Sequence, residues 1–437
     1  MTDQRTKIEL AEDHIPTHWY NLAADLPAGC PPHLNPATRE PVTADDLAAI
    51  FPPGLIEQEL SGERWIEIPS EIRELYRLWR PSPLYRARRF EQALGTKARI
   101  YCKYEGASPV GSHKTNSSIA QAWYNKQAGR LRLTTETGAG QWGAALSFAC
   151  QLLGMECKVW QVRSSYDSKP YRRMQMETFG GQVASSPSEL TEAGRALRKR
   201  YPDTSGSLGM AISEAIEAAV KDPDASYALG SVLNHVALHQ TVIGQETIAQ
   251  LLDAGEKMPD HLFACAGGGS NLAGISFPFI HSNLEGKSST TITACEPAAA
   301  PSLTQGEYRY DFGDTANMTP LLKMHSLGSD FVPDPVHAGG LRFHGMAPLV
   351  SAAYDQGLMK ATAFKQRDAF AAGVTFARAQ GIIPAAESNH AIAGAVEYLR
   401  NAENDAEGEV ILIGISGNGQ LDLPAYHDFL EGTILDA

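Results

Sequence analysis

The chain has 437 residues, of which 43% are hydrophobic and 20% charged, a composition typical of a folded globular protein long enough for two domains. Its net charge of −13 at pH 7 disfavours a nucleic-acid partner, because binding phosphates requires a basic surface. Its longest apolar runs are of strand length and its first residues lack an apolar signal core, so we expect no membrane span and a cytoplasmic protein.

Six cysteines and thirteen histidines are scattered along the chain without the spacing of a zinc site. No two cysteines form a C-x-x-C pair, and most of them lie in apolar contexts where cysteine behaves as a small core residue. We therefore expect reduced cysteines and no metal centre built from these residues.

Residues 1–60 are rich in proline and predict an extended arm, whose apolar side chains should pack on the body of the protein: Trp19, Tyr20, Leu22, Phe51, Leu55 and Ile56. After it, short apolar runs alternate with helix-like segments, which is typical of a parallel α/β architecture. The expected strands are residues 99–104, 131–135, 157–162, 182–184, 261–266, 291–295 and 409–415. The stretch 186–232 looks largely helical, and we divide the body into domains of residues 61–230 and 231–437.

Lys114 stands at the start of an expected helix (residues 117–127), after a strand and a loop of small residues. Positive charge is unfavourable there, because the backbone amides already make a helix N-terminus positive. The difficulty disappears if the amine is neutral, either as a desolvated base or as an imine with a carbonyl cofactor such as pyridoxal phosphate. A solvated lysine is the competing interpretation, and this segment alone favours it.

Residues 134–143 read Thr-Thr-Glu-Thr-Gly-Ala-Gly-Gln-Trp-Gly and contain a G-x-G-x-x-G pattern between a strand and a helix. A dinucleotide site would need an acidic residue at the end of the next strand, which here ends Trp-Gln-Val-Arg163. Glu136 at the mouth of the loop would also repel a pyrophosphate. We therefore expect the loop to hold a small carboxylate, with Glu136 beside it as an acid or base.

The loop at residues 265–274, Cys-Ala-Gly-Gly-Gly-Ser-Asn-Leu-Ala-Gly, follows an expected strand and opens a helix. Its glycines expose backbone amides at a helix N-terminus, an arrangement that binds phosphate. Because it lacks the lysine of a P-loop, it favours a phosphate monoester such as that of pyridoxal phosphate over a nucleoside triphosphate. A tight strand-to-helix turn is the alternative, and three consecutive glycines make it the weaker one.

Ser416 ends a buried apolar run and begins a glycine-flanked turn, Ser-Gly-Asn-Gly419. A neutral hydroxyl opposite a pyridine nitrogen would leave that nitrogen unprotonated, unlike the aspartate that makes the ring a full electron sink. A simple strand-end turn explains these residues equally well.

Taken together, these segments resemble the beta chain of tryptophan synthase. The three loops occur in the family's order with four further motifs, at residues 80–84, 340–345, 387–391 and 416–419. The resemblance covers the chain from about residue 18. The proline-rich arm, Trp142 and the Gly-Leu-Arg-Phe-His-Gly345 stretch are similar to the second, stand-alone-like type of beta chain.

This resemblance implies a fold type II pyridoxal-phosphate enzyme: two three-layer α/β domains with the cofactor in the cleft and a mobile subdomain at about residues 130–215. It implies that Lys114 and Glu136 are catalytic. The implied cofactor-binding residues are His113, Lys114, Asn116, Gly267, Gly268, Gly269, Ser270, Asn271, Glu387 and Ser416. The implied substrate-binding residues are Thr137, Gly138, Ala139, Gly140, Gln141, Trp142 and Arg342.

The implied reaction is a β-replacement in which L-serine or O-phospho-L-serine reacts with indole to give L-tryptophan. Arg342, where the first-type beta chain carries an aspartate, would suit a phosphate donor or would instead close the site by pairing with an acid. Three alternatives remain. The enzyme could use another nucleophile in the same reaction, it could deaminate the donor, or the chain could be a non-catalytic subunit that binds the cofactor. We also expect a homodimer, and the resemblance allows for a weakly bound alpha chain and a monovalent cation.

Three residues depart from the pattern of the second-type beta chains: Asn389, Asn418 and Gln420. All three lie in strand-end turns expected beside the ring of the cofactor, so they leave the identity of the second substrate open.

Overall fold

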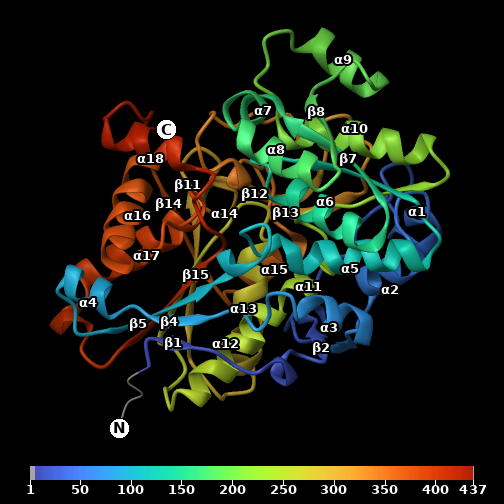
Figure 1. Ribbon diagram of the computed structural model, residues 1–437. Helices are drawn as coiled ribbons and strands as arrows, with labels where there is room; N and C mark the ends of the chain where they lie inside the picture. The colour runs from blue at the N-terminus through green and yellow to red at the C-terminus, as the bar shows by residue number, and fades with distance from the viewer. Residues whose placement is uncertain (1–4, 437) are drawn as a thin grey trace.

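The structure, a computed structural model, describes residues 5–436 and contains two larger sheets (Figure 1). The first has seven strands, of which β1 and β4 are antiparallel to their neighbours and the others run parallel. In spatial order they are β1 (Lys7–Ile8), β4 (Leu84–Arg86), β5 (Arg99–Tyr104), β15 (Val410–Ile415), β10 (His261–Cys265), β11 (Thr291–Pro297) and β14 (Lys360–Phe364).

The second sheet is parallel throughout, with the spatial order β8 (Gln182–Ser186), β7 (Glu156–Val162), β6 (Arg132–Thr137) and β9 (Ala225–Tyr227). Two antiparallel pairs complete the strands: β2 (His18–Tyr20) with β3 (Trp65–Glu67), and β12 (Glu307–Phe312) with β13 (Leu321–Ser326). The expected parallel α/β fold is therefore confirmed.

Helices follow most strands. Those that carry or support the site are α5 (Lys114–Gln127), α6 (Gln141–Leu153), α8 (Pro170–Thr178), α10 (Leu208–Lys221), α11 (Asn234–Gln240), α12 (Val242–Asp253), α13 (Ser270–Leu284) and α17 (Ser388–Asn401). The others are α1 (Ala44–Leu47), α2 (Pro53–Leu60), α3 (Ser70–Tyr76), α4 (Arg88–Leu94), α7 (Arg163–Ser168), α9 (Glu192–Arg200), α14 (Ser302–Gln305), α15 (Pro348–Asp355), α16 (Gln366–Gln380) and α18 (Leu423–Leu430).

The strands β10 and β15 lie at the centre of the larger sheet and are buried on both faces, which is why they read as continuous apolar runs. Alternate residues of β15 belong to two different cores. Leu412 packs in the core that contains Ile275 of α13, whereas Ile411 packs in the core that contains Ile392 of α17. Helices therefore cover both faces of this sheet, and loops at its carboxyl edge are brought together between them.

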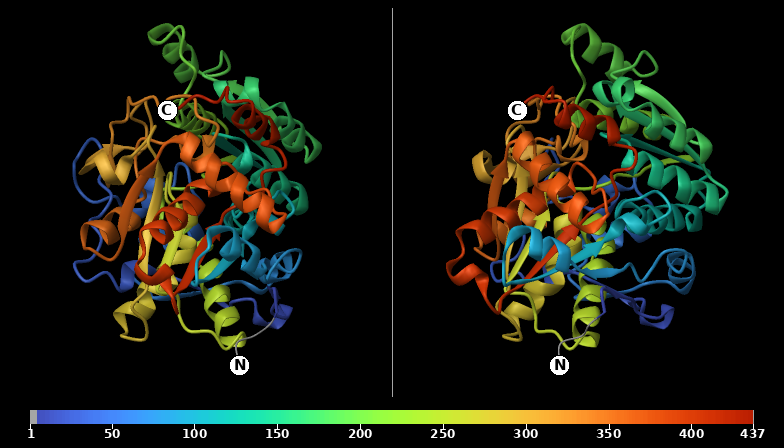
Figure 2. Two further views of the ribbon diagram at one scale, coloured as in Figure 1. Left: turned by 90° about the vertical axis from the view of Figure 1, so that its left-hand side faces the viewer. Right: turned by 60° about the vertical axis from the view of Figure 1, so that its left-hand side comes forward.

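The smaller sheet and its helices α6 to α10 form a separate lobe, green in Figure 1, while α16 to α18 lie on the opposite side of the molecule. Figure 2 shows that the segment around α9 projects furthest from the body. The expectation of a largely helical stretch at 186–232 is wrong at its end, because residues 225–227 form β9. This strand is only three residues long and has no apolar run of its own.

The strand β5 belongs to the larger sheet, where it pairs with β15 some 300 residues later in the chain. The proposed boundary near residue 230 therefore separates two stretches of sequence that share one sheet. The part from β6 to β9 forms a separate four-stranded sheet.

The N-terminal segment contributes to the core. Trp19, Tyr20, Leu22 and Leu55 are fully buried, and Phe51 and Ile56 nearly so, as their apolar character predicted. The segment is not simply extended, since α2 packs against α11 and α5 and β2 pairs with β3. Among residues 5–436, no helix is both long and apolar enough to cross a membrane.

Candidate active site

A pocket opens where the carboxyl ends of β10 and β15 meet the N-termini of α5 and α13. This edge is where ligands bind in parallel α/β sheets. Its walls come from segments that are far apart in the sequence: Ser112, His113, Lys114, Gln141, Cys265, Gly267, Gly268, Gly269, Ser270, Asn271, Gly340, Leu341, Glu387 and Ser416.

Lys114 is the first residue of α5 and faces this pocket. Its Nζ donates hydrogen bonds to the carbonyl of Gly230 and, at 2.8 Å, to Oγ of Ser270. Burial lowers the pKa of Lys114 to about 8, although the nearby carboxylates of Glu136 and Glu387 act in the opposite direction. A substantial fraction of the amine is therefore neutral near pH 8, as its place at a helix N-terminus predicted.

The loop Gly267 to Gly269 forms one wall of the pocket and leads into α13, whose positive dipole end faces the pocket. Gly269 has a φ of +99°, a conformation that favours glycine, and a Cβ on Gly267 would lie 2.6 Å from the Cα of Leu341. The loop thus needs its glycines both for its turn and for close packing.

Two further observations support phosphate binding at this wall. The hydroxyl of Ser112 is buried in the lining and has no hydrogen-bond partner within the described part of the chain. His113 contacts Ser270 Oγ through Nε2 at 3.0 Å, and burial, aided by Lys114, lowers the pKa of His113 to about 3. A neutral imidazole and an unpaired hydroxyl suit an anionic oxygen ligand.

Ser416 follows β15 directly and lies at another side of the pocket. Its hydroxyl is 2.8 Å from that of Ser388, and it also accepts a contact of 3.5 Å from the thiol of Cys265. No charged group is bonded to this hydroxyl in the described structure. The pocket therefore presents a neutral hydroxyl where the sequence suggested a partner for a pyridine nitrogen.

Glu136 lies at the end of β6 and is buried. Burial raises the pKa of Glu136 to about 7, and a hydrogen bond of 2.6 Å from the Tyr227 hydroxyl partly opposes this rise. The charges of Glu136 and Lys114 interact, so the two side chains are near one another although Glu136 does not line the pocket itself. The site therefore combines an amine and a carboxyl group that both titrate near neutral pH.

The loop after Glu136 reaches the pocket through Gln141, whose Nε2 donates to Glu387 at 2.8 Å. Glu387 also accepts a hydrogen bond of 2.9 Å from the backbone N–H of Gly340. These contacts connect the smaller sheet to the larger one across the pocket. The four residues that precede Gln141 in this loop do not line the pocket: Thr137, Gly138, Ala139 and Gly140.

Comparison with known proteins identifies the family. Residues 75–417 match the family model described as "Pyridoxal-phosphate dependent enzyme". The chain is 54% identical to "Tryptophan synthase beta chain 2" of Methanosarcina acetivorans, with 99% of this chain and 98% of that protein covered, and 54% identical to the protein of the same name from Thermotoga maritima, with 97% and 100% covered. The chain belongs to the tryptophan synthase beta chain family.

The fold is shared more widely. A crystal structure of an L-serine ammonia-lyase from Rhizomucor miehei superposes with a TM-score of 0.61 at 16% identity, covering 82% of this chain and 99% of that one. The expected fold class and family are thus confirmed, and the expected cofactor, pyridoxal phosphate, is that of the family. Among the residues described, no three or more His, Cys, Asp or Glu side chains are grouped to hold a metal ion.

Within this beta-chain fold, Asn116 does not line the pocket, although the sequence predicted it beside the cofactor. Its side chain is fully buried. Its Oδ1 accepts from Arg80 at 2.8 Å, and its Nδ2 donates to Glu105 and Gln240 at 3.2 and 3.0 Å. All of its hydrogen-bonding groups are used in this network.

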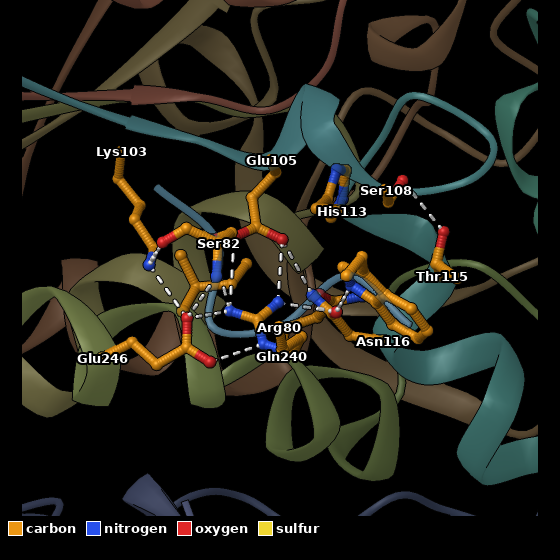
Figure 3. Close-up of polar contacts among 12 residues, drawn as sticks. Arg80, Ser82, Lys103, Glu105, Ser108, His113, Thr115, Asn116, Gln240 and Glu246 are labelled. Atoms are coloured by element: carbon orange, nitrogen blue, oxygen red, sulfur yellow. Dashed lines mark hydrogen bonds and ion pairs between the residues drawn. The ribbon is translucent and has the colours of Figure 1, made fainter. Parts of the chain in front are cut away.

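Figure 3 shows the network that holds Asn116. Arg80 lies between Glu105 and Glu246, at 3.0 and 2.6 Å, and Lys103 contacts Glu246 at 2.9 Å. All four side chains are at most 2% exposed, and their charges balance. The network ties β5 and α12 to the first turn of α5, so it positions the turn that carries Lys114.

Trp142 and Arg342 also lie outside the pocket of this beta chain. Trp142 packs in the core against Gly230 and donates to Thr135 Oγ1 at 2.6 Å. Arg342 donates to Ser164 Oγ and to the carbonyl of Pro333, both at 2.8 Å. Among residues 5–436 no acidic side chain forms an ion pair with Arg342, so the expected pairing with an acid is not seen there, and the guanidinium is occupied by Ser164 and Pro333.

Sequence reasoning missed Ser112, Cys265, Gly340 and Leu341 in the lining, and Tyr227 beside Glu136. Ser112 adjoins the motif of Lys114, whereas Cys265, Gly340 and Leu341 lie inside motifs at 265–274 and 340–345 and could have been included with them. Tyr227 lies in the short strand β9, and nothing in its local sequence distinguishes it from a core residue.

Proposed function

We propose that this chain catalyses a pyridoxal-phosphate-dependent β-replacement in which L-serine or O-phospho-L-serine reacts with indole to give L-tryptophan. The observation that carries the proposal is the pairing of Lys114 and Glu136, two groups that titrate near neutral pH beside a glycine-rich phosphate cradle. Groups with such pKa values are suited to acid and base catalysis under physiological conditions.

In this proposal Gly267 to Asn271 and His113 would hold the phosphate of the cofactor, Ser416 would lie on the side of its pyridine nitrogen, and Lys114 would attach the cofactor through Nζ. The bound cofactor supplies an electron sink for the bonds to the donor's Cα. Because the hydroxyl of Ser416 is uncharged, it would leave the pyridine nitrogen unprotonated and the ring a weaker electron acceptor. A weaker acceptor favours chemistry at Cβ over transamination. Glu387, tied to Gln141 and Gly340, orients the opposite wall.

Lys114 would accept the proton from Cα, since its lowered pKa leaves part of its amine unprotonated near pH 8. Glu136 then donates a proton to the departing oxygen at Cβ. Its pKa of about 7 means that about half of it carries this proton at neutral pH. The loop 137–141 would position the donor's carboxylate, because its residues connect Glu136 to the pocket wall at Gln141.

An apolar cavity adjoins the site and offers a place for the nucleophile. Its lining includes Tyr227, the hydrogen-bond donor to Glu136, and Leu229, next to the residue that accepts from Lys114. Ile212, Leu322 and Phe343 contribute further apolar surface. A flat apolar molecule such as indole matches these walls.

Arg342 gives no reason to prefer the phosphorylated donor, because its guanidinium is engaged with Ser164 and Pro333. Burial also lowers the pKa of Arg342 to about 10. We therefore keep both donors in the proposal.

The test is to incubate the purified holoenzyme with L-serine or O-phospho-L-serine, with and without indole, and to identify the products. We expect tryptophan only when indole is present. Formation of pyruvate and ammonia in the same amount with and without indole would favour the deamination alternative. Inert donors would overturn the proposal, and kcat/KM for the two donors would rank them.

The assembly is also proposed. We infer a homodimer in the cytoplasm, with an alpha chain bound weakly if at all. The weak binding of an alpha chain is supported by the packing of the N-terminal segment on the body, where Trp19 and Tyr20 are fully buried. This leaves indole to arrive from solution.

A further inference from the structure

The loop between β9 and α11, residues 228–233, contacts both Lys114 and Glu136. The carbonyl of Gly230 accepts a hydrogen bond from Nζ of Lys114. Burial raises the pKa of Glu136, and a backbone hydrogen bond from Gly230 opposes this rise together with the bond from Tyr227. One glycine therefore lies between the two groups that titrate near neutral pH, so the position of this loop matters to both.

The loop is strained and closely packed. Val232 has a φ of +80°, a conformation that is an outlier for a β-branched residue and persists only where surrounding contacts impose it. A Cβ on Gly230 would lie 2.5 Å from Cγ of Trp142, and a Cβ on Gly268 of the glycine-rich wall would collide with Ser231. Contacts outside the loop must therefore hold it in this conformation.

Two side chains from distant segments hold the ends of the loop. At its start, Gln121 of α5 donates to the carbonyl of Leu229 at 2.8 Å and accepts from the N–H of Leu229 at 3.1 Å. At its end, the carboxylate of Glu59 accepts from the backbone N–H groups of Asn234 and His235 at 3.1 and 3.0 Å. These N–H groups belong to the first turn of α11 and have no partner within a helix. Glu59 thus anchors the end of the loop from the N-terminal segment.

Glu59 is suited to this task because it is buried and ionised. Nε2 of His33 and Nδ1 of His235 each lie 2.7 Å from one of its oxygens. Burial by itself raises the pKa of Glu59, but the hydrogen bonds from His235 and His33 hold it well below its usual range. An ionised carboxylate accepts on both oxygens, which lets Glu59 bind two adjacent backbone N–H groups as well as two imidazoles.

We propose that Glu59 is a positioning residue for the reaction: by holding the first turn of α11, it imposes the strained conformation of the loop and places Gly230 against Lys114. The inference rests on the proposed function, in which Lys114 is the base. Without the carboxylate, Val232 can relax to an ordinary backbone conformation, and the carbonyl of Gly230 then moves away from Nζ.

The experiment measures the pKa of Lys114 in the full chain freed of pyridoxal phosphate. Acetylation by acetic anhydride is followed as a function of pH by mass spectrometry, with the exposed Lys199 as internal standard. A carbonyl binds an ammonium group more strongly than a neutral amine, so Glu59→Gln should lower the pKa of Lys114 by about one pH unit. The other titratable groups that face this amine stay unchanged in the variant: Glu136, Glu387, Cys265 and His113.

Glu296 provides a matched control. Its buried carboxylate also accepts two adjacent backbone N–H groups at a helix start, those of Leu303 and Thr304 at 2.7 and 3.0 Å, and it does not line the pocket. Glu296→Gln removes one acceptor oxygen there, as Glu59→Gln does at α11. It should leave the pKa of Lys114 where it is.

Two further variants separate position from charge. Glu59→Asp keeps the charge but withdraws both oxygens, so it should also lower the pKa of Lys114. Glycine adopts a φ of +80° without strain, so adding Val232→Gly to Glu59→Gln should restore most of the wild-type pKa. A direct electrostatic effect of the lost carboxylate would persist in that double variant.

An unchanged pKa of Lys114 in folded Glu59→Gln, an equal fall in Glu296→Gln, or no recovery on adding Val232→Gly would overturn the inference. Melting temperatures show which variants are folded, and Glu59→Asp and the double variant decide the matter if Glu59→Gln is not. The measurement uses neither cofactor nor donor. A lowered pKa in the variant of an enzyme that forms no tryptophan would therefore overturn the proposed function alone, and tryptophan formation with an unchanged pKa would overturn this inference alone.

Discussion

The hydroxyl of Tyr227 donates a hydrogen bond of 2.6 Å to Oε2 of Glu136. This bond favours the charged form of a carboxyl group whose pKa burial raises to about 7. Tyr227 thus keeps Glu136 able to gain and lose a proton near neutral pH.

Replacing Tyr227 by Phe should raise the pKa of Glu136 further, because the bond it removes stabilises the carboxylate. A general acid remains protonated to higher pH when its pKa rises, so the fall in kcat/KM for the donor at high pH should move upward by about one pH unit. A pH–rate profile measures this shift. Tyr20→Phe, which removes a buried hydroxyl remote from the site, should leave the profile in place, and a downward shift in Tyr227→Phe would contradict the role of Glu136 as an acid.

Glu136→Gln should bind cofactor and donor but lose turnover. An amide keeps the size of the carboxyl group and has no proton to give, so kcat for release of the β-substituent should fall about 10²–10⁴-fold. Single-turnover measurements with L-serine test this. Turnover equal to that of the wild type would assign the acid role to another group.

Lys114→Ala should abolish covalent attachment of pyridoxal phosphate and with it the visible absorption of the bound cofactor. The reason is that Lys114 contributes the amine at the phosphate cradle. Absorption spectra and mass spectrometry after reduction with borohydride report the attachment. Lys103→Ala removes a lysine outside the pocket, so a folded Lys103 variant should retain the attachment. A wild-type protein that stays colourless when given pyridoxal phosphate would contradict the whole assignment.

Arg80→Met should destabilise the protein by about 3–5 kcal/mol, because it leaves Glu105 and Glu246 buried with an uncompensated charge. Urea unfolding of the wild type and the variant gives this difference. Lys97→Met breaks an ion pair with Glu407 on the surface and should change stability little. Equal effects of the two substitutions would show that the buried network is not a main source of stability.

The protein should sediment as a homodimer and gain little activity from an alpha chain. The N-terminal segment buries Trp19, Tyr20 and Leu55 on the body, so it is not free to bind a partner as a flexible tail. Sedimentation of the chain alone and titration with an alpha chain under turnover conditions test both points. Tight equimolar binding of an alpha chain with strong activation would contradict this prediction.

Much of the site was predictable because its chemistry depends on local sequence. Each of three features can be recognised within a few residues: a lysine at a helix start, a glycine run that opens a helix, and a serine at the end of a buried strand. The structure brings Lys114, Gly267 to Gly269 and Ser416 into one pocket because parallel strands end at the same edge of a sheet. The cofactor and family were therefore accessible from the sequence by itself.

The tertiary structure decided which polar residues serve the pocket and which serve the core. Asn116, two residues after Lys114, turns away from the pocket because its partners Arg80 and Gln240 come from 36 and 124 residues away. Tyr227 and Glu59 gain their places only when a short strand folds beside Glu136 and the N-terminal segment folds against α11. Such roles depend on burial and on contacts between distant segments, which the order of residues along the chain does not reveal.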